Sequence, residues 1–239
     1  MMSLEGLFPI DKWDLRSGSI LHQLPEADEE RLRLHMSEQR YAKGDLLFRE
    51  GGLPLGIFFI REGRVKRFTT DRDQKEHILY VANKGELLGY HAVLAEERFP
   101  DSAAALEDTR VAFIPREDFL ATLDTSAVLS RRLLRAFSHE YTVLTNSISI
   151  FAQRSVRERL AITLIVLREK YKENSHRGPV SINISREDLA NMVGTAKENV
   201  VRLLREFKTA HIVETRGRTI FITNLKKLID ISTFGPEGI

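Results

Sequence analysis

Short apolar runs broken by glycine-containing turns fill the chain between Tyr41 and Pro115. The stretch from Leu55 to Phe68, for example, has an apolar run on each side of a turn at Arg61-Glu62-Gly63. Many short strands at such spacing, with no long helical pattern between them, predict a small antiparallel barrel or roll. The clearest runs are KGDLLFREGG (43–52), LGIFFIREGRVKRF (55–68), HILYVANKGELLGY (77–90) and RVAFIP (110–115).

After Pro115 the hydrophobic period becomes that of a helix. Apolar residues recur alternately at intervals of three and four, which is the a/d pattern of a coiled coil. Ser138, His139, Glu140, Asn146 and Ser147 lie between them, so we expect a narrow apolar stripe. We expect this helix to pair with its copy in a homodimer; the alternative is a helix lying on its own domain's core. The stripe consists of Leu134, Phe137, Tyr141, Leu144, Ile148 and Phe151.

The remaining chain predicts a second helix, a helix-turn-helix and a hairpin. The helix runs from Val156 to about Lys172, and the polar stretch KENSHRGP (172–179) follows it. PVSINI (179–184) can form a short strand, and HIVETRGRTIFIT (211–223) predicts strand, turn and strand.

Two short helices are expected between these strands. Ser185 is a good N-cap for the first, with Asp188 in its first turn. The turn Val193-Gly194-Thr195 separates the helices, and Thr195 is expected to cap the second, with Glu198 completing a capping box. Cap, helix, glycine turn, cap and helix form the helix-turn-helix layout.

The second helix, about 196–208, has distinct apolar and polar sides. A recognition helix touches base edges from its N-terminal part. Arg202 can bind guanine O6 and N7, Glu198 can accept from cytosine N4, and Val201 can touch a thymine methyl group. The alternative is a solvated face on which Glu198 and Arg202 form an i,i+4 pair. The expected core residues are Val200, Leu203, Leu204 and Phe207. The opposite side holds Lys197, Glu198, Val201, Arg202 and Arg205.

The charge is unevenly distributed along the chain. Residues 157–239 hold 15 basic and 10 acidic residues, whereas the remainder holds 21 and 24, so a net charge of +5 adjoins one of −3. A basic segment joined to a slightly acidic body is typical of a nucleic-acid module attached to another domain. Basic residues at the hairpin tip, Arg216-Gly217-Arg218, are suited to phosphate contacts.

Composition excludes several classes of protein. The chain has no cysteine, so disulfides, thiolate zinc sites and cysteine-ligated iron–sulfur clusters are excluded. No apolar run reaches the length of a membrane span, and the first residues lack the apolar core of a secretory signal.

We expect an α+β protein with an N-terminal antiparallel β-roll of the jelly-roll type over residues 1–118. A dimerisation helix over 119–154 and a winged helix-turn-helix over 155–239 follow.

From about Asp28 to Leu228 the chain resembles the superfamily of the cyclic-AMP receptor protein and the fumarate-and-nitrate-reduction regulator (the CRP/FNR superfamily). The landmarks are Lys43-Gly44-Asp45 with Gly51, the GELLGY segment, the long helix, and SREDLANMVGTAKENVVRLLREF, which also looks like a branch common in Bacteroidetes. The resemblance implies a cytoplasmic, homodimeric transcription regulator that binds double-stranded DNA and works with RNA polymerase. An effector at the junction of roll and long helix would reorient the recognition helices.

The superfamily's base-reading triplet falls on Lys197, Glu198 and Arg202. Lys197 departs from the arginine of the cyclic-AMP branch, and lysine lacks that residue's planar bidentate fork. We expect Glu198 and Arg202 to specify bases, and Arg186 and Arg218 to contact phosphates. All expected DNA contacts are Ser185, Arg186, Thr195, Lys197, Glu198, Val201, Arg202, Arg205 and Arg218.

The implied effector pocket matches the cyclic-nucleotide branch only in part. Asp101 stands where that branch has the arginine that binds the cyclic phosphate, and a carboxylate there disfavours cyclic AMP unless another base such as Arg98 reaches in. The expected effector contacts are Gly85, Glu86, Leu87, Ser102, Ala103, Leu144 and Thr145.

Three functional classes remain to be distinguished. A regulator controlled by an unidentified small molecule is the main reading, and a constitutive regulator whose roll has lost its ligand is the alternative that Asp101 favours. We do not expect haem: His91 falls at the histidine position of the CO-sensing branch, but Gly89 replaces its cysteine partner. An enzyme is not expected either, because the sequence lacks a nucleotide-triphosphate loop, an HExxH motif and a nucleophile elbow, and we predict no metal site.

Overall fold

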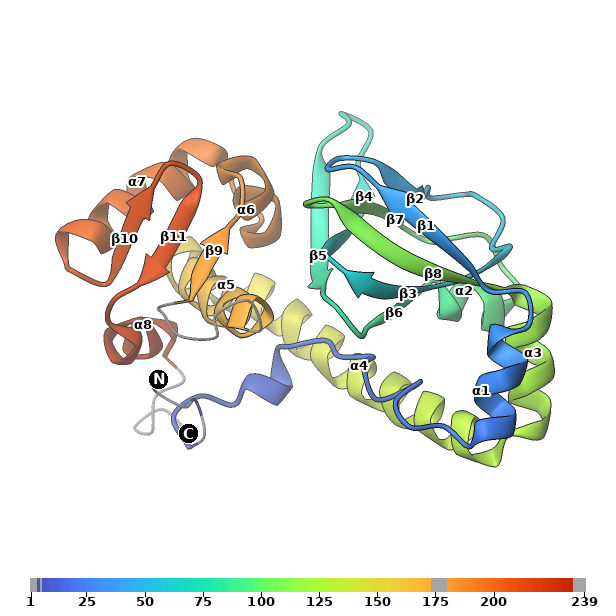
Figure 1. Cartoon of the computed structure of the whole chain (residues 1–239). Helices are drawn as coiled ribbons and strands as arrows, with labels where there is room; N and C mark the ends of the chain where they lie inside the picture. Colours follow the sequence, from blue (N-terminus) through green and yellow to red (C-terminus); the bar gives the residue numbers. More distant parts are fainter. Residues whose placement is uncertain (1–3, 5, 173–179, 234–239) are drawn as a thin grey trace. The chain divides into compact units, whose positions relative to one another are not determined.

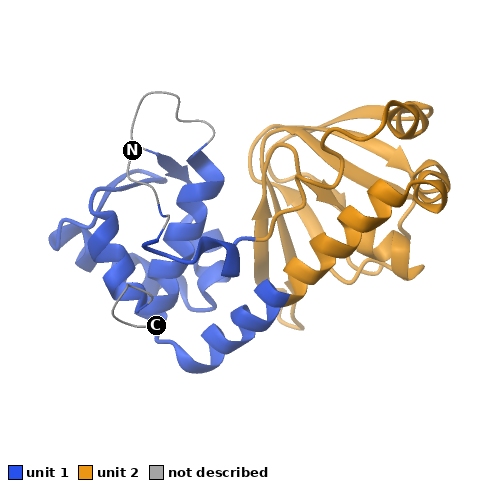
Figure 2. Ribbon diagram, turned by 90° about the horizontal axis from the view of Figure 1, so that it is seen from below, with its two compact units in different colours: residues 1–14, 142–239 blue, residues 15–141 orange. Residues whose placement is uncertain are grey.

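The computed structural model describes residue 4, residues 6–172 and residues 180–233. The polar stretch expected at 172–179 therefore lies, apart from its first residue, outside the described part. The chain divides into two compact units, Leu15–Tyr141 and Met1–Asp14 with Thr142–Ile239 (Figure 2). The polypeptide thus passes between the units twice, once after Asp14 and once within the long helix.

The unit Leu15–Tyr141 is built on two four-stranded antiparallel sheets (Figure 1). Their strand orders are β1-β8-β3-β6 and β2-β7-β4-β5. This confirms the predicted antiparallel roll. The strands are β1 Ser37–Tyr41, β2 Leu46–Phe48, β3 Gly56–Glu62, β4 Val65–Thr70, β5 Glu76–Ala82, β6 Leu87–Leu88, β7 Ser102–Ala105 and β8 Thr109–Pro115.

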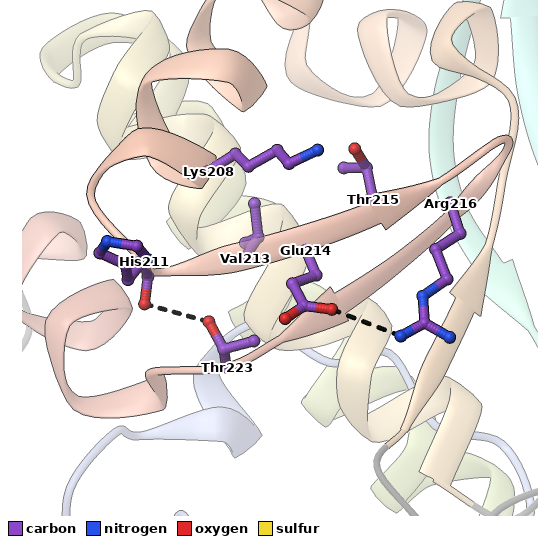
Figure 3. A pocket seen from close by; sticks show the side chains of 7 residues that line it. All are labelled: Lys208, His211, Val213, Glu214, Thr215, Arg216 and Thr223. Carbon is purple, nitrogen blue, oxygen red and sulfur yellow. Dashed lines mark hydrogen bonds and ion pairs between the residues drawn. The ribbon is translucent and has the colours of Figure 1, made fainter.

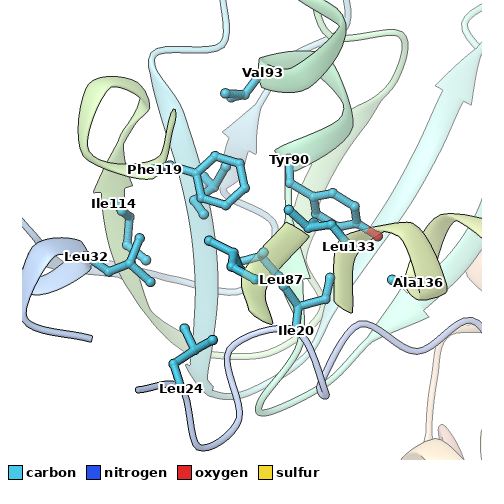
Figure 4. Packing of buried hydrophobic residues seen from close by; sticks show 12 residues of the cluster. Ile20, Leu24, Leu32, Leu87, Tyr90, Val93, Ile114, Phe119, Leu133 and Ala136 are labelled. Carbon is cyan, nitrogen blue, oxygen red and sulfur yellow. The ribbon is translucent and has the colours of Figure 1, made fainter. Parts of the chain in front are cut away.

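Helices cover this roll and share its core. Three lie within the unit, α1 (Glu26–Arg33), α2 (Tyr90–Ala95) and α3 (Arg116–Thr125), and α4 (Ala127–Gln153) extends beyond it. Figure 4 shows the buried cluster, in which side chains from all four helices meet those of the strands. Its members include Ile20, Leu32, Ile57, Leu87, Tyr90, Phe119, Leu129 and Leu133.

The helix expected over 119–154 is divided in two. Ser126 has an extended backbone (φ −100°, ψ 99°) between α3 and α4. Its hydroxyl oxygen accepts a hydrogen bond of 3.1 Å from the amide of Leu129, as the cap of a new helix does. A local side-chain cap, which the heptad pattern does not reveal, therefore ends one helix and begins the next.

The coiled-coil stripe on α4 is exposed, with one exception. Phe137 is partly buried because it packs against the roll's core, with its ring 5.4 Å from that of Tyr90. The helix buries a separate set of side chains, among them Leu129, Leu133 and Ala136. The exposed stripe is made of Leu134, Tyr141, Leu144, Ile148 and Phe151.

The second unit contains the winged helix-turn-helix. Its three-stranded antiparallel sheet has the order β10-β11-β9. Ser155 caps α5 with the two reciprocal hydrogen bonds that it forms with Glu158. The elements are α5 Val156–Tyr171, β9 Ser181–Asn183, α6 Arg186–Val193, α7 Lys197–Thr209, β10 Val213–Arg216, β11 Thr219–Ile222 and α8 Leu225–Ser232.

The N-terminal segment belongs to this second unit, although it was expected with the roll. Leu4 and Phe8 are buried, and a short 3₁₀ turn spans Ile10–Lys12. Asp14 forms a buried ion pair of 3.0 Å with Lys170 of α5. A buried charge needs such a partner, so this pair fixes the segment on α5.

Candidate nucleic-acid interface

The recognition helix α7 has the two faces that its sequence predicts. Val200, Leu203, Leu204 and Phe207 are buried. On the other side Glu198, Arg202 and Arg205 are exposed, with Lys197 at the first turn, and Val201 is partly exposed. The core therefore fixes the helix and leaves the expected reading face open to solvent.

One of the two predicted caps is confirmed and one is wrong. The Ser185 hydroxyl oxygen accepts a hydrogen bond of 2.8 Å from the amide of Asp188 and caps α6. The second helix is preceded by Ala196, which is extended and provides no side-chain cap. Because the helix begins at Lys197, Thr195 is one residue too early to cap it. The Thr195 hydroxyl oxygen accepts instead from the side-chain amide (Nδ2) of Asn199, at 3.1 Å.

The turn between α6 and α7 requires glycine. Gly194 has a φ of +68°, and a Cβ atom there would lie 2.8 Å from the Phe151 ring. Arg159 of α5 donates hydrogen bonds to the carbonyls of Val193 (2.9 Å) and Gly194 (3.2 Å). Phe151 at the end of α4 and Arg159 thus both contact the turn that precedes the recognition helix.

Two basic residues of the expected reading face, Lys197 and Arg202, each pair with an acidic residue that does not belong to that face. Arg202 forms an ion pair of 2.6 Å with Glu206, one turn further along α7. The alternative pairing of Arg202 with Glu198 is therefore not the one adopted, and Glu198 stays on the exposed face. Lys197 lies 3.5 Å from Glu187 of α6.

The tip of the wing lies beside the first helix of the motif. Arg186 donates hydrogen bonds to the carbonyls of Gly217 (3.1 Å) and Arg218 (3.2 Å). Gly217 adopts a φ of +56° at this turn. Arg186 and Arg218, both expected on phosphates, are therefore brought together by the fold.

A cavity of about 430 Å³ lies between the end of α7 and the outer strand β10 (Figure 3). Thr223 closes one side by donating to the His211 carbonyl at 3.0 Å, and Glu214 lies 3.7 Å from Arg216. Acidic and basic groups both face it, so its charge favours no single class of ligand. Its lining residues are Lys208, His211, Val213, Glu214, Thr215, Arg216 and Thr223.

In the roll, the residue that departs from the cyclic-AMP branch is paired internally. Asp101 is 1% exposed, and its carboxylate accepts from Arg67 Nε at 2.9 Å and from Arg67 Nη2. Burial raises the pKa of the Asp101 carboxyl, and the Arg67 charge acts in the opposite direction. Asp101 is therefore not the unpaired repelling charge that the sequence suggested, because Arg67 compensates it.

His91 completes this buried group. Its Nε2 lies 2.6 Å from Arg67 Nη2. Burial and the Arg67 charge lower the pKa of His91 to about 3, so the imidazole is neutral and Nε2 accepts the hydrogen bond. Tyr90, the next residue back along the chain, donates to the Glu140 carboxylate of α4. The interior of the roll is thus crossed by polar contacts among the protein's own side chains.

The loop that was expected to hold an effector is also bonded within the protein. Ser17 Oγ accepts from the amide of Leu87 (2.8 Å) and donates to its carbonyl (3.0 Å). Gly85 has a φ of +85° and donates its amide to the Ile60 carbonyl at 2.8 Å. Glu86 and Leu87 are buried. Residues from the start of the roll unit therefore cover this loop.

The other expected effector residues are divided between the units. Ser102 is buried and its hydroxyl oxygen accepts from the Glu50 amide at 2.9 Å, while Ala103 is buried in β7. Leu144 and Thr145 are exposed on the part of α4 that belongs to the other unit. Arg98, the base considered as a substitute, donates to the Gly51 carbonyl at 2.8 Å and is exposed.

Two residues of this site were missed from the sequence. Arg67 lies two positions after buried Val65 in β4, so strand alternation would have placed it inward. Its partner Asp101 had no local signal, because it lies 34 residues further along the chain. Ser17 had no local signal, because its partner Leu87 is 70 residues away.

Candidate metal sites and candidate membrane helices are both absent from the described residues. No three His, Cys, Asp or Glu side chains gather there in a way that could hold a metal ion. Within the same residues, no helix combines the length and the apolar character needed to cross a bilayer.

Comparison with known proteins finds matches for both units. A cyclic nucleotide-binding domain model matches residues 38–126, and a Crp-like helix-turn-helix domain model matches residues 158–231. The fumarate and nitrate reduction regulatory protein of Vibrio cholerae is 26% identical over 197 residues, covering 82% of this chain and 78% of its own. The cyclic AMP receptor protein of Thermus thermophilus is 23% identical over 218 residues, covering 91% and 98%. The structure of FixK2 from Bradyrhizobium japonicum superposes with a TM-score of 0.74 at 19% identity, covering 82% of this chain and 96% of that one.

Proposed function

Since this chain belongs to the CRP/FNR superfamily of DNA-binding transcription regulators, we propose that it acts as a homodimer that reads a palindromic DNA site. The proposal includes a cytoplasmic location, RNA polymerase as a partner and no catalytic activity of its own. The observation that carries it is the pair of faces on α7, of which one is buried and the other presents Glu198 and Arg202 to solvent.

The position of these two side chains supports the proposed base reading. Glu198 and Arg202 are one turn apart in the N-terminal half of α7, opposite the core residues. The N-terminal part of a recognition helix enters the major groove, where a guanidinium matches guanine and a carboxylate matches the cytosine amino group. Arg186 and Arg218 lie together at the wing, which suits contacts to the phosphate backbone.

The exposed stripe on α4 supports the proposed dimerisation. Tyr141 and Ile148 are 75% and 71% exposed in the single chain, and both lie on the same heptad position as Leu134. A contiguous apolar stripe that the single chain leaves exposed is favourably buried against a second copy. A two-fold axis between two such helices gives a palindromic site with half-sites about one helical turn apart.

The test is a binding selection on randomised DNA sites with Arg202→Ala and Arg218→Ala. Arg202→Ala should cost about 1–3 kcal/mol of binding free energy and relax the preference at one base position of each half-site. Arg218→Ala should weaken binding to all DNA sequences alike, and it should reduce the slope of log affinity against log salt concentration by about one. If Arg202→Ala keeps the wild-type sequence preference and loses only overall affinity, the assigned reading face is wrong.

A second candidate function is constitutive DNA binding without a ligand in the roll. The favouring observation is that Arg67 pairs with Asp101, Ser17 bonds to Leu87, and Ser102 bonds to Glu50. A ligand at this place would have to replace these contacts, and each buried group left unpaired costs about 1–3 kcal/mol. In the main proposal, by contrast, the roll binds an effector whose hydrogen bonds replace the ones that these side chains lose.

Cyclic AMP is therefore expected neither to bind tightly nor to raise DNA affinity. The Arg67 guanidinium, which could attract its phosphate, is already held by Asp101. Titration calorimetry on the purified protein, combined with DNA binding in the presence and absence of the nucleotide, measures both effects. Tight cyclic-AMP binding with increased DNA affinity would contradict this expectation.

A further inference from the structure

Glu206 lies beside the reading face without being part of it. It follows Arg202 by one helical turn, about 40° further round the axis of α7. The Arg202 guanidinium donates through Nη1 to Glu206 Oε1 at 2.6 Å. Arg202 is 61% exposed, so the pair restrains a side chain that the core does not hold.

The pair leaves most of the guanidinium available. Arginine has five N–H donors, and Arg202 uses one on Nη1 to donate to the Glu206 carboxylate. The groups on Nη2 and Nε remain to bind the two acceptors of a guanine in the major groove. A guanine contact can therefore form while the ion pair persists, and the pair limits the rotamers that Arg202 can adopt.

A phosphate contact by Arg202 differs from a guanine contact in its effect on the ion pair with Glu206. If Arg202 turned from the reading face to the backbone of non-specific DNA, it would give up its ion pair with Glu206. Glu206 would then also lie unpaired near phosphates, which repel its carboxylate. The pair therefore opposes the non-specific complex and supports the specific one.

We propose that Glu206 is a positioning residue for DNA reading, which holds Arg202 in its base-reading orientation and disfavours its use as a phosphate contact. The inference rests on the proposed function of Arg202. Lys197, the other basic residue of the base-reading triplet, also pairs with an acidic residue: its Nζ lies 3.5 Å from the carboxylate of Glu187 in α6. Both acidic residues lie outside the set of side chains that the reading face presents.

The experiment compares Glu206→Gln with the wild-type protein, using the palindrome from the selection and a random duplex at several salt concentrations. The substitution keeps the shape of the side chain and removes its charge. We expect affinity for the palindrome to fall about twofold to fivefold, with a weaker preference at the Arg202 base position. Affinity for the random duplex should rise about twofold, and its salt slope should increase.

Two controls make the outcome specific. Asp230→Asn removes an exposed carboxylate from α8 of the same unit and should leave the ratio of the two affinities unchanged. Glu206→Asp keeps a charge that can pair at i,i+4 and should restore part of the wild-type ratio. A structural role alone would not produce opposite changes on the two DNAs.

The result that overturns the inference is an unchanged affinity ratio and base preference in Glu206→Gln. If Arg202→Ala nevertheless relaxes the base preference, only the role of Glu206 is refuted. If Arg202→Ala leaves the preference intact as well, the proposed reading face itself has failed.

Discussion

Ile148→Glu is expected to convert the proposed dimer into monomers. Ile148 is 71% exposed in the single chain, so the substitution should leave each monomer folded. In the dimer it would bring two carboxylates into an apolar seam near the two-fold axis, where each charge lacks a partner. An unpaired buried charge at an interface costs about 2–5 kcal/mol, so we expect the dimer dissociation constant to rise about 100-fold or more. Sedimentation at micromolar concentration measures it.

Ile148→Glu should also lower the affinity for the DNA palindrome, because the protein no longer dimerises. One recognition helix alone contacts one half-site, so the palindrome loses the effective concentration that links the two. The matched control is Ser149→Glu, which adds the same charge at the neighbouring exposed position, off the stripe. A dimeric Ile148→Glu protein, or a wild-type protein that is monomeric at this concentration, would refute the seam.

Asp101→Ala is expected to destabilise the roll by about 3–5 kcal/mol, because it leaves the buried Arg67 guanidinium without its carboxylate. Both side chains are largely shielded from water, so solvent cannot replace the lost partner. Chemical denaturation of the full chain measures the change in unfolding free energy. Asp101→Arg should not create a phosphate site, since it puts a second guanidinium beside Arg67.

The control for this prediction is an exposed ion pair in the same unit. Glu62 pairs with Arg110 at 2.7 Å on the surface of the roll, and Glu62→Ala should cost at most about 1 kcal/mol. The double variant Arg67→Met with Asp101→Leu removes both charges and should recover much of the loss. If Asp101→Ala costs no more than Glu62→Ala, the buried pair does not stabilise the roll.

Sequence patterns with a range of a few residues predicted the local structure well. The strands between Tyr41 and Pro115, the cap at Ser185 and the buried face of α7 all appear as expected. Each depends on a residue's type and on its neighbours within a turn or two, so a single sequence contains the information. The cap assigned to Thr195 failed by one position, because two adjacent residues can start a helix and only the backbone angles distinguish them.

Contacts between distant residues were decided only by the tertiary structure. Arg67 and Asp101 are 34 positions apart, and Ser17 and Leu87 are 70 apart. The stripe on α4 looked uniform in sequence, but Phe137 packs against the roll's core and is partly buried, whereas Ile148 is exposed. The free energy of a buried charge or of an apolar side chain depends on what the fold packs against it. Local patterns in the sequence therefore predicted the elements and the exposed polar face of α7. The partner of Asp101 and the exposure of the stripe on α4 depended on packing that no local pattern contains.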